Sequence, residues 1–214
     1  MQIFDHLSIE FPEKTVFLRL GGHCTKTGLD ERAKAQFIQW SRRAFELCRP
    51  CGRWKLLPLK VCHHNGVEIG HDFLPLGKDF CCGRTATHLW CGAVTIGSAL
   101  TEARDSLTEL SAGAVYDAVG SECADAAMDM LFALSRSALS RQGVLLDKRR
   151  FSPGYGDMPL ELQNFFYHEL KMEQMGVEIT SNSFFVPEKT VTAFAFAHTL
   201  YNLLKKVWMT CDSE

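Results

Sequence analysis

The chain has 214 residues, of which 46% are hydrophobic and 22% are charged. These fractions are ordinary for a globular protein with a sizeable core, and the length predicts a single domain over residues 1–214. The formal net charge of -2 argues against a broad nucleic-acid-binding face. No run of about 18 apolar residues exists and no secretory signal is visible, so we expect no membrane span and a cytoplasmic location.

In the N-terminal half, the sequence predicts two helices, then a pair of strands, then one buried strand. Asp30 is the expected N-cap of the second helix, in which apolar residues recur at steps of three and four. The Asn65-Gly66 pair favours a primed hairpin turn between the paired strands. Gly97 closes the buried strand. In chain order, these elements cover residues 13–20, 30–48, 54–61, 67–73 and 89–97.

The C-terminal half opens with the two strongest helical patterns of the chain. In the second of them, five residues are expected to share one face: Ala124, Met128, Leu131, Ser135 and Leu139. Another helix begins after Pro159, and a pair of strands and a further helix follow it. In chain order, these elements cover residues 100–110, 112–139, 160–174, 178–185, 190–198 and 200–209. Helices placed between strands that can pair antiparallel predict an α+β fold.

Two C-terminal stretches carry a family resemblance. Residues 150–160 (RFSPGYGDMPL) resemble the R-x-x-P-G-Y segment of the activation domain of cobalamin-dependent methionine synthase, and still more the SPGYGD-x-P-L form of its free-standing relatives. Residues 176–191 (GVEITSNSFFVPEKTV) resemble the family segment that runs from iG-x-x-L-T to P-x-x-S-V. Weaker matches at 16–21, 93–97 and 117–121 extend the resemblance over nearly the whole chain.

The resemblance implies a fold, a twisted antiparallel sheet with packed helices, and it implies a function. The chain would be an accessory protein for reductive reactivation of a cobalamin-dependent methionine synthase or a related corrinoid methyltransferase. It would bind S-adenosylmethionine as the methyl donor. No Asp-x-His-x-x-Gly cobalamin-ligating motif is present, so we expect a partner protein to carry the cobalamin. No proton has to move in the methyl transfer, and we therefore expect no catalytic residue.

The resemblance also assigns ligand contacts to five residues. Arg150 offers a planar, bidentate fork to the ligand carboxylate, and Tyr155 lies along the ligand and donates its hydroxyl. The backbone near Ser152 meets the adenine, and Gly154 belongs to a turn that presents backbone groups to the ligand. Asp125 falls at the family's glutamate position on the inner helix and supplies negative charge beside the sulfonium.

Each of these residues also has a plain structural interpretation. Arg150 could form a surface salt bridge, Tyr155 could be a core aromatic residue, and Asp125 could be solvated. Phe151 departs from the family pattern, in which an alanine is common. The family's N-terminal acidic contact has three candidates here: Asp5, Glu13 and Asp30. These departures support an alternative hypothesis, a non-catalytic docking or regulatory module for a corrinoid protein that does not bind S-adenosylmethionine.

Nine cysteines at irregular spacing, without a secretory signal, favour reduced thiols. Cys48-x-x-Cys51 closes a predicted helix, where the helix dipole disfavours a thiolate, so we expect no redox role for it. A loose group of cysteines and histidines lacks the regular spacing of a zinc site, and no metal is expected. A metal- or thiol-dependent enzyme that uses this group is a third hypothesis. The group consists of Cys62, His63, His64, His71, Cys81 and Cys82.

Overall fold

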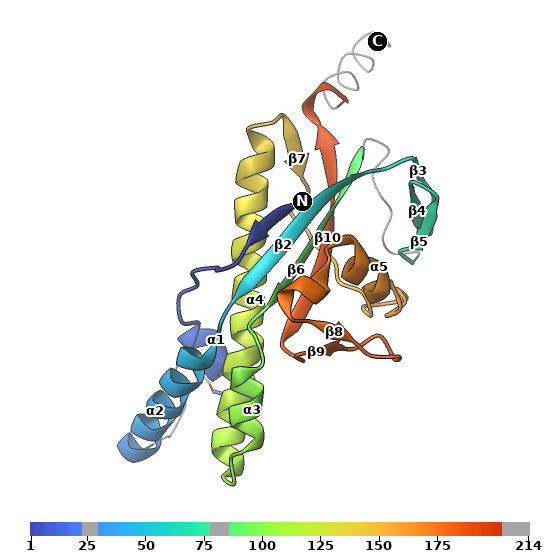
Figure 1. Cartoon of the computed structure of the whole chain (residues 1–214). Helices are drawn as coiled ribbons and strands as arrows, with labels where there is room; N and C mark the ends of the chain where they lie inside the picture. The colour runs from blue at the N-terminus through green and yellow to red at the C-terminus, as the bar shows by residue number, and fades with distance from the viewer. Residues whose placement is uncertain (23–29, 78–85, 203–214) are drawn as a thin grey trace.

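The computed structural model describes residues 1–22, 30–77 and 86–202, and its main feature is a five-stranded antiparallel sheet (Figure 1). The strand order is β1-β2-β6-β10-β7, so strands far apart in the sequence are neighbours. These strands are β1 (Gln2–Phe4), β2 (Cys51–Pro58), β6 (His88–Thr95), β7 (Val144–Leu146) and β10 (Thr190–Thr199). An antiparallel sheet combined with packed helices confirms the α+β fold predicted from the sequence.

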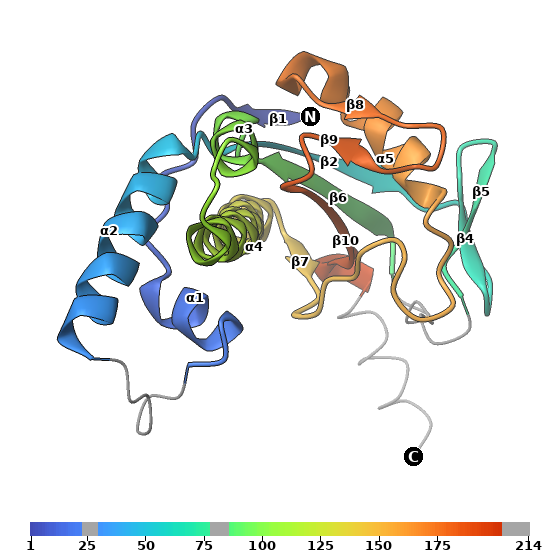
Figure 2. The same ribbon diagram turned by 90° about the horizontal axis from the view of Figure 1, so that it is seen from below.

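One long helix, α4 (Leu110–Ser140), crosses one face of the sheet, and α5 (Leu162–Glu169) lies on the other face (Figure 2). A 3-10 turn over Met172–Met175 follows α5. Three further helices pack against α4, namely α1 (Glu13–Arg19), α2 (Glu31–Leu47) and α3 (Ala99–Asp105). In the part of the chain that the structure describes, neither α4 nor any other helix has the length and hydropathy of a membrane span.

Side-chain size on β10 alternates with the two faces of the sheet. The alanines of β10 belong to the core beneath α4: Ala193, Ala195 and Ala197. Phe194 and Phe196 belong to the core on the opposite side, where the Phe194 ring stacks on Phe166 of α5 with centroids 6.2 Å apart. Successive side chains of a strand point to opposite faces, so the small residues allow α4 to approach the sheet closely. The large residues fill the space beneath α5.

The predicted helices of the N-terminal half and the two strong central patterns are confirmed. Helix α1 matches residues 13–20, and α2 matches 30–48, with the Asp30 side chain accepting a hydrogen bond from the Ala33 amide at 2.7 Å. The helix predicted over 100–110 is the shorter α3, which ends at Asp105, and residues 112–139 lie within α4. The five residues expected on one face of α4 are all buried in the core.

A short hairpin is present at the turn predicted over residues 63–66: residues 61–62 pair antiparallel with residues 67–68, and the His63 amide donates to the Gly66 carbonyl at 2.8 Å. The longer pairing predicted between residues 54–61 and 67–73 is wrong. Strand β2 pairs with β1 and β6, while the following residues form a separate three-stranded sheet. Gly66 is a strand residue of that sheet, and a Cβ added to it would lie 2.3 Å from the carbonyl oxygen of Leu74. Close approach of the neighbouring strand explains this glycine better than a primed turn does. The small sheet consists of β3 (Val61–Cys62), β4 (Gly66–Ile69) and β5 (Asp72–Pro75).

The predicted pairing of residues 178–185 with 190–198 is also wrong. Strand β8 (Glu178–Ile179) pairs instead with β9 (Phe185–Val186), and β10 pairs with β6 and β7. The helix predicted over 160–174 is shorter, since Lys171 has a left-handed backbone with φ of 49° after α5 ends. Of the helix predicted over 200–209, only the first residues lie in the described chain, and they are helical. No sequence pattern predicted β1 and β7.

Candidate functional site

A cavity of about 580 Å³ lies where α4, the segment after β7, α5 and the start of β10 meet. We call it the Arg150 cavity. Four of the five residues expected to contact a ligand line this cavity: Asp125, Arg150, Ser152 and Tyr155. The other lining residues are Arg149, Phe151, Pro153, Gln163, Thr190, Val191 and Thr192. The fold therefore gathers, around one space, polar residues from four separate parts of the chain.

The segment that carries Arg150 is attached to the sheet beyond β7. The Phe151 amide donates to the Phe194 carbonyl at 2.9 Å, and the Phe194 amide donates back to the Phe151 carbonyl at 2.8 Å. The two rings also pack together, with centroids 5.6 Å apart. Phe151, the residue that departs from the family pattern, thus anchors the backbone beside the cavity. Its neighbours on both sides are held at the cavity wall.

The turn after this segment holds Gly154 and Tyr155. Gly154 has φ of 86°, a left-handed conformation that favours glycine, and it does not line the cavity. Gly154 is therefore a turn residue next to the cavity wall. The Tyr155 side chain is 71% exposed, so its interpretation as a core aromatic residue is wrong. Tyr155 borders the cavity on the solvent side, where its hydroxyl is free to reach a bound molecule.

Arg150 already has a carboxylate partner. Its guanidinium forms an ion pair with Asp129, one helical turn beyond Asp125 on α4. The same guanidinium lies over the ring of Phe132, with its central carbon 5.8 Å from the ring centroid. The salt bridge considered as the plain interpretation is therefore present. The Asp129 side chain is 69% exposed, so a carboxylate arriving in the cavity competes with a partner that water can readily solvate.

Asp125 lies in the cavity wall and is close to a second cation. The Nη2 atom of Arg19, at the end of α1, is 3.6 Å from the Asp125 carboxylate, while Arg19 Nε donates to Glu122 at 2.5 Å. Burial raises the pKa of Asp125, the Glu122 charge raises it further, and Arg19 acts in the opposite direction. The negative charge expected beside the ligand is thus present, but it is shared with Arg19.

Two buried polar atoms of the cavity wall have no hydrogen-bond partner among the described residues. They are Oε1 of Gln163 and Oγ1 of Thr192. Leaving such an atom unpaired costs about 1–3 kcal/mol, and most buried polar groups of native proteins find a partner. Both residues line the same cavity as Arg150, although the two atoms themselves are buried. No motif in the sequence pointed to either residue.

A network of charged residues holds the entry into β10. Lys189 Nζ lies 2.7 Å from the Asp117 carboxylate and 3.3 Å from Glu188. Arg104 of α3 pairs with Asp117 at 2.9 Å and also forms an ion pair with Glu188. The hydrogen bond from Arg104 lowers the pKa of Glu188. The residues that follow Lys189 form the β10 wall of the Arg150 cavity, so the network fixes that wall relative to α3 and α4.

The cysteine and histidine patterns do not assemble a site in the described part of the chain. Cys48 and Cys51 are free thiols, with Cys48 capping the end of α2. Cys62 is disulfide-bonded, which differs from the reduced thiols expected for it. Across residues 1–22, 30–77 and 86–202, no three side chains of the metal-binding types gather as a metal ion requires. Cys81 and Cys82 of the predicted group lie outside those ranges.

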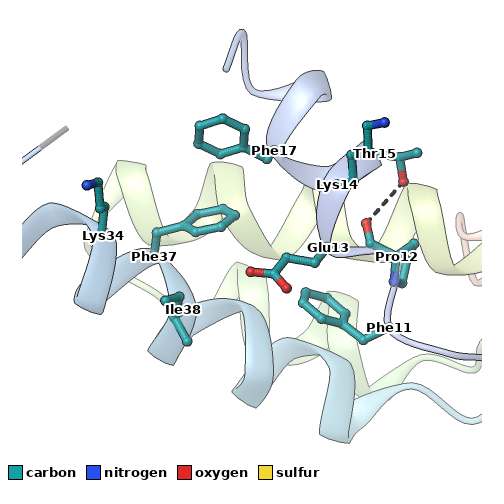
Figure 3. A pocket seen from close by; sticks show the side chains of 9 residues that line it. All are labelled: Phe11, Pro12, Glu13, Lys14, Thr15, Phe17, Lys34, Phe37 and Ile38. Carbon is teal, nitrogen blue, oxygen red and sulfur yellow. Dashed lines mark hydrogen bonds between the residues drawn. The ribbon is translucent and has the colours of Figure 1, made fainter. Parts of the chain in front are cut away.

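A second cavity of about 570 Å³, largely apolar, lies between α1 and α2 (Figure 3). Figure 3 shows the Glu13 carboxylate pointing into it between the rings of Phe11 and Phe37. Glu13 was one candidate for the family's N-terminal acidic contact, and Asp30, another, caps α2. Neither of them, nor Asp5, lines the Arg150 cavity. The carboxylates near that cavity come from α4 instead.

Comparison with known proteins gives a match at the level of structure. No family model and no curated protein matches the sequence. A crystal structure of the MetH reactivation domain bound to AdoHcy superposes with a TM-score of 0.61 and 16% sequence identity. The match covers 92% of this chain and 80% of that chain. The chain therefore has the fold of the methionine synthase reactivation domain, which is the fold implied by the sequence resemblance.

Proposed function

We propose that this chain binds S-adenosylmethionine in the Arg150 cavity and supports reductive reactivation of a cobalamin-dependent methionine synthase or a related corrinoid methyltransferase. The fold shared with the MetH reactivation domain makes this role reasonable, and that domain is bound to AdoHcy, the demethylated form of the same ligand. A partner protein would carry the cobalamin. The reduced corrinoid supplies the nucleophile that accepts the methyl group, and this chain would hold and orient the donor.

The observation that carries the proposal is the chemical match between the cavity wall and the ligand. The ligand has a carboxylate, a sulfonium and an adenine, and the wall offers the Arg150 guanidinium, the Asp125 carboxylate and the segment of Ser152 and Tyr155. Arg150 would receive the carboxylate through a charge-assisted pair of hydrogen bonds. The backbone at Ser152 would meet the adenine, with Gly154 setting the turn, and Tyr155 would cover the ligand on the solvent side.

Calorimetric titration of the chain with S-adenosylmethionine, on the wild type and on Arg150→Ala, tests the proposal. We expect saturable binding to the wild type, weakened in the variant by about 1.5–3 kcal/mol for each charge-assisted hydrogen bond that the substitution removes. Arg136→Ala is a matched control, because Arg136 also lies over the Phe132 ring, at 6.0 Å, but does not line the cavity. This control should keep the wild-type affinity.

Two outcomes of the titration would contradict the proposal. Equal affinity in the wild type and in Arg150→Ala would remove the role assigned to this guanidinium. Absence of binding to the wild type at millimolar ligand would remove S-adenosylmethionine binding by the chain itself. The control variant separates both outcomes from a general effect of deleting an arginine near Phe132.

A second candidate function is a docking or regulatory module for a corrinoid protein that does not bind S-adenosylmethionine. One observation favours it: both ligand-facing charges, Arg150 and Asp125, already have partners of opposite charge. Copurification with a cobalamin protein, together with no S-adenosylmethionine binding, would support this candidate over the first. Saturable binding of S-adenosylmethionine would exclude it.

A further inference from the structure

The carboxylates of α4 beside the Arg150 cavity are matched by guanidinium groups. Asp125 has Arg19 at 3.6 Å, and the same arginine donates to Glu122 at 2.5 Å. Asp129 is paired with Arg150. A third cation, Arg149, lines the cavity with its guanidinium 5.2 Å from the centroid of a phenylalanine ring. These carboxylates and guanidinium groups balance one another in charge.

This charge balance affects how strongly Asp125 attracts a positively charged ligand group. S-adenosylmethionine carries one more positive charge than S-adenosylhomocysteine, and that charge is on the sulfur. A carboxylate without a partner would attract the sulfonium and leave the uncharged thioether largely unaffected. The guanidinium of Arg19 already partly neutralises the Asp125 carboxylate, so less negative charge is left to attract a sulfonium. With Arg19 in place, Asp125 gives the methylated ligand little advantage over the demethylated one.

We infer that Arg19 determines the selectivity of the Arg150 cavity between the sulfonium and the thioether form of the ligand. With the Arg19–Asp125 pair intact, S-adenosylhomocysteine binds at least as tightly as S-adenosylmethionine. This inference rests on the proposed function and adds to it the electrostatic origin of ligand preference.

Arg19 lies outside the cavity wall, and its side chain is partly exposed. It is the last residue of α1, its side chain is 45% exposed, and it does not line the cavity. The packing of α1 against α4 depends instead on Val16, which is fully buried. Arg19→Ala should therefore fold normally and remove the positive charge near Asp125 and Glu122. Arg19→Lys keeps the charge and should retain the wild-type selectivity.

The test is the ratio of the two dissociation constants, measured by calorimetry at low ionic strength with S-adenosylmethionine and S-adenosylhomocysteine. Wild type should bind S-adenosylhomocysteine as tightly or more tightly. In Arg19→Ala, the dissociation constant for S-adenosylmethionine divided by that for S-adenosylhomocysteine should fall about fivefold, as expected for one partly exposed charge pair. Lys14→Ala, an exposed cation of the same helix, is the matched control and should leave the ratio unchanged.

A second pair of variants locates the effect. In Asp125→Asn, removal of Arg19 should move the ratio much less, because the only carboxylate then freed is Glu122, which does not line the cavity. An unchanged ratio in Arg19→Ala, or an equal change for both ligands, would overturn the inference while leaving the proposed function intact. Binding of neither ligand to the wild type would overturn the proposed function, and the inference with it.

Discussion

Thr192 and Thr95 are buried threonines on neighbouring strands, yet their hydroxyl groups have different surroundings. The Thr95 hydroxyl lies 2.9 Å from the Thr190 hydroxyl and accepts a hydrogen bond from the Gly97 amide at 3.2 Å. The Thr192 hydroxyl is buried without a partner among the described residues, in a residue that lines the Arg150 cavity. One hydroxyl thus contributes hydrogen bonds to the fold, and the other does not.

Thr192→Val should have opposite effects on stability and on binding. The change removes an unpaired buried hydroxyl, so the free energy of unfolding should rise by up to about 1 kcal/mol. Affinity for S-adenosylmethionine should fall by up to about tenfold, since one hydrogen bond to the ligand is removed. Urea unfolding and calorimetry on the same preparation measure both quantities. Thr95→Val is the control and should destabilise by about 1 kcal/mol; a similar loss in Thr192→Val would argue for a structural role.

At the residue scale, sequence reasoning located part of the cavity. Arg150 and Tyr155 belong to one contiguous motif, so the family resemblance alone was enough to place them together. Gln163, Thr192 and Arg19 come from α5, β10 and α1, and only the packing of these elements brings them near Arg150. Their position depends on contacts distant in the sequence, which no local pattern encodes.

At the element scale, the contact between α4 and β10 depends on small side chains. Three alanines of β10 lie beneath the helix, each fully buried. On β6, Gly92 makes room for a neighbouring ring, since an added Cβ would lie 2.3 Å from Trp90. The helix and the sheet therefore pack so closely that no space is left between them for larger side chains.

Ala195→Leu should destabilise the protein by about 1–3 kcal/mol, because the larger side chain has no space beneath α4. Chemical denaturation monitored by circular dichroism measures the change in the free energy of unfolding. The same substitution at Ala35, an exposed position of α2, should change it by less than about 0.5 kcal/mol. Equal, small effects at both positions would show that the helix can move away from the sheet without cost.

Helices were predicted better than strand pairing, for a physical reason. The periodicity of α2 and α4 is a property of each segment, since one face of an amphipathic helix repeats locally. Strand partners are determined by the whole fold: residues 54–61 were expected to pair with residues 67–73, yet β2 pairs with β1 and β6, and only the two residues of β3 form the local hairpin with β4. Short strands such as β1 and β7 carry too few residues for an alternating pattern to be recognised.

At the scale of the whole molecule, the charged network at Arg104 connects three parts of the chain. It links α3, α4 and the entry into β10 through Asp117, Glu188 and Lys189. Glu188 has an ordinary pKa of 4.5 that is lowered in the folded protein by the hydrogen bond from Arg104. A carboxyl group with a lowered pKa stabilises the fold above its unfolded pKa, and the stabilisation is lost as pH falls through its folded pKa.

Arg104→Ala should therefore change the pH dependence of stability. Near neutral pH, the variant should lose about 1 kcal/mol or less, because Glu188 is partly exposed to solvent. Between about pH 5 and about pH 3, it should lose less stability than the wild type, since the pKa of Glu188 is then lowered by Lys189 alone and no longer by Arg104 as well. Urea unfolding across this range measures both effects, with Arg136→Ala as the control. Parallel pH profiles for wild type and Arg104→Ala would contradict this role of the network.

Strand β10 lies between β6 and β7 in the sheet but follows both of them in the chain. Until β10 has been synthesised, β6 has only β2 beside it, and an apolar strand keeps one edge unpaired. Such edges promote aggregation, and pairing between strands so distant in sequence is slow. The insertion of β10 therefore closes the centre of the sheet and the wall of the Arg150 cavity together. We therefore expect slower insertion of β10 to leave more of the newly made chain open to aggregation.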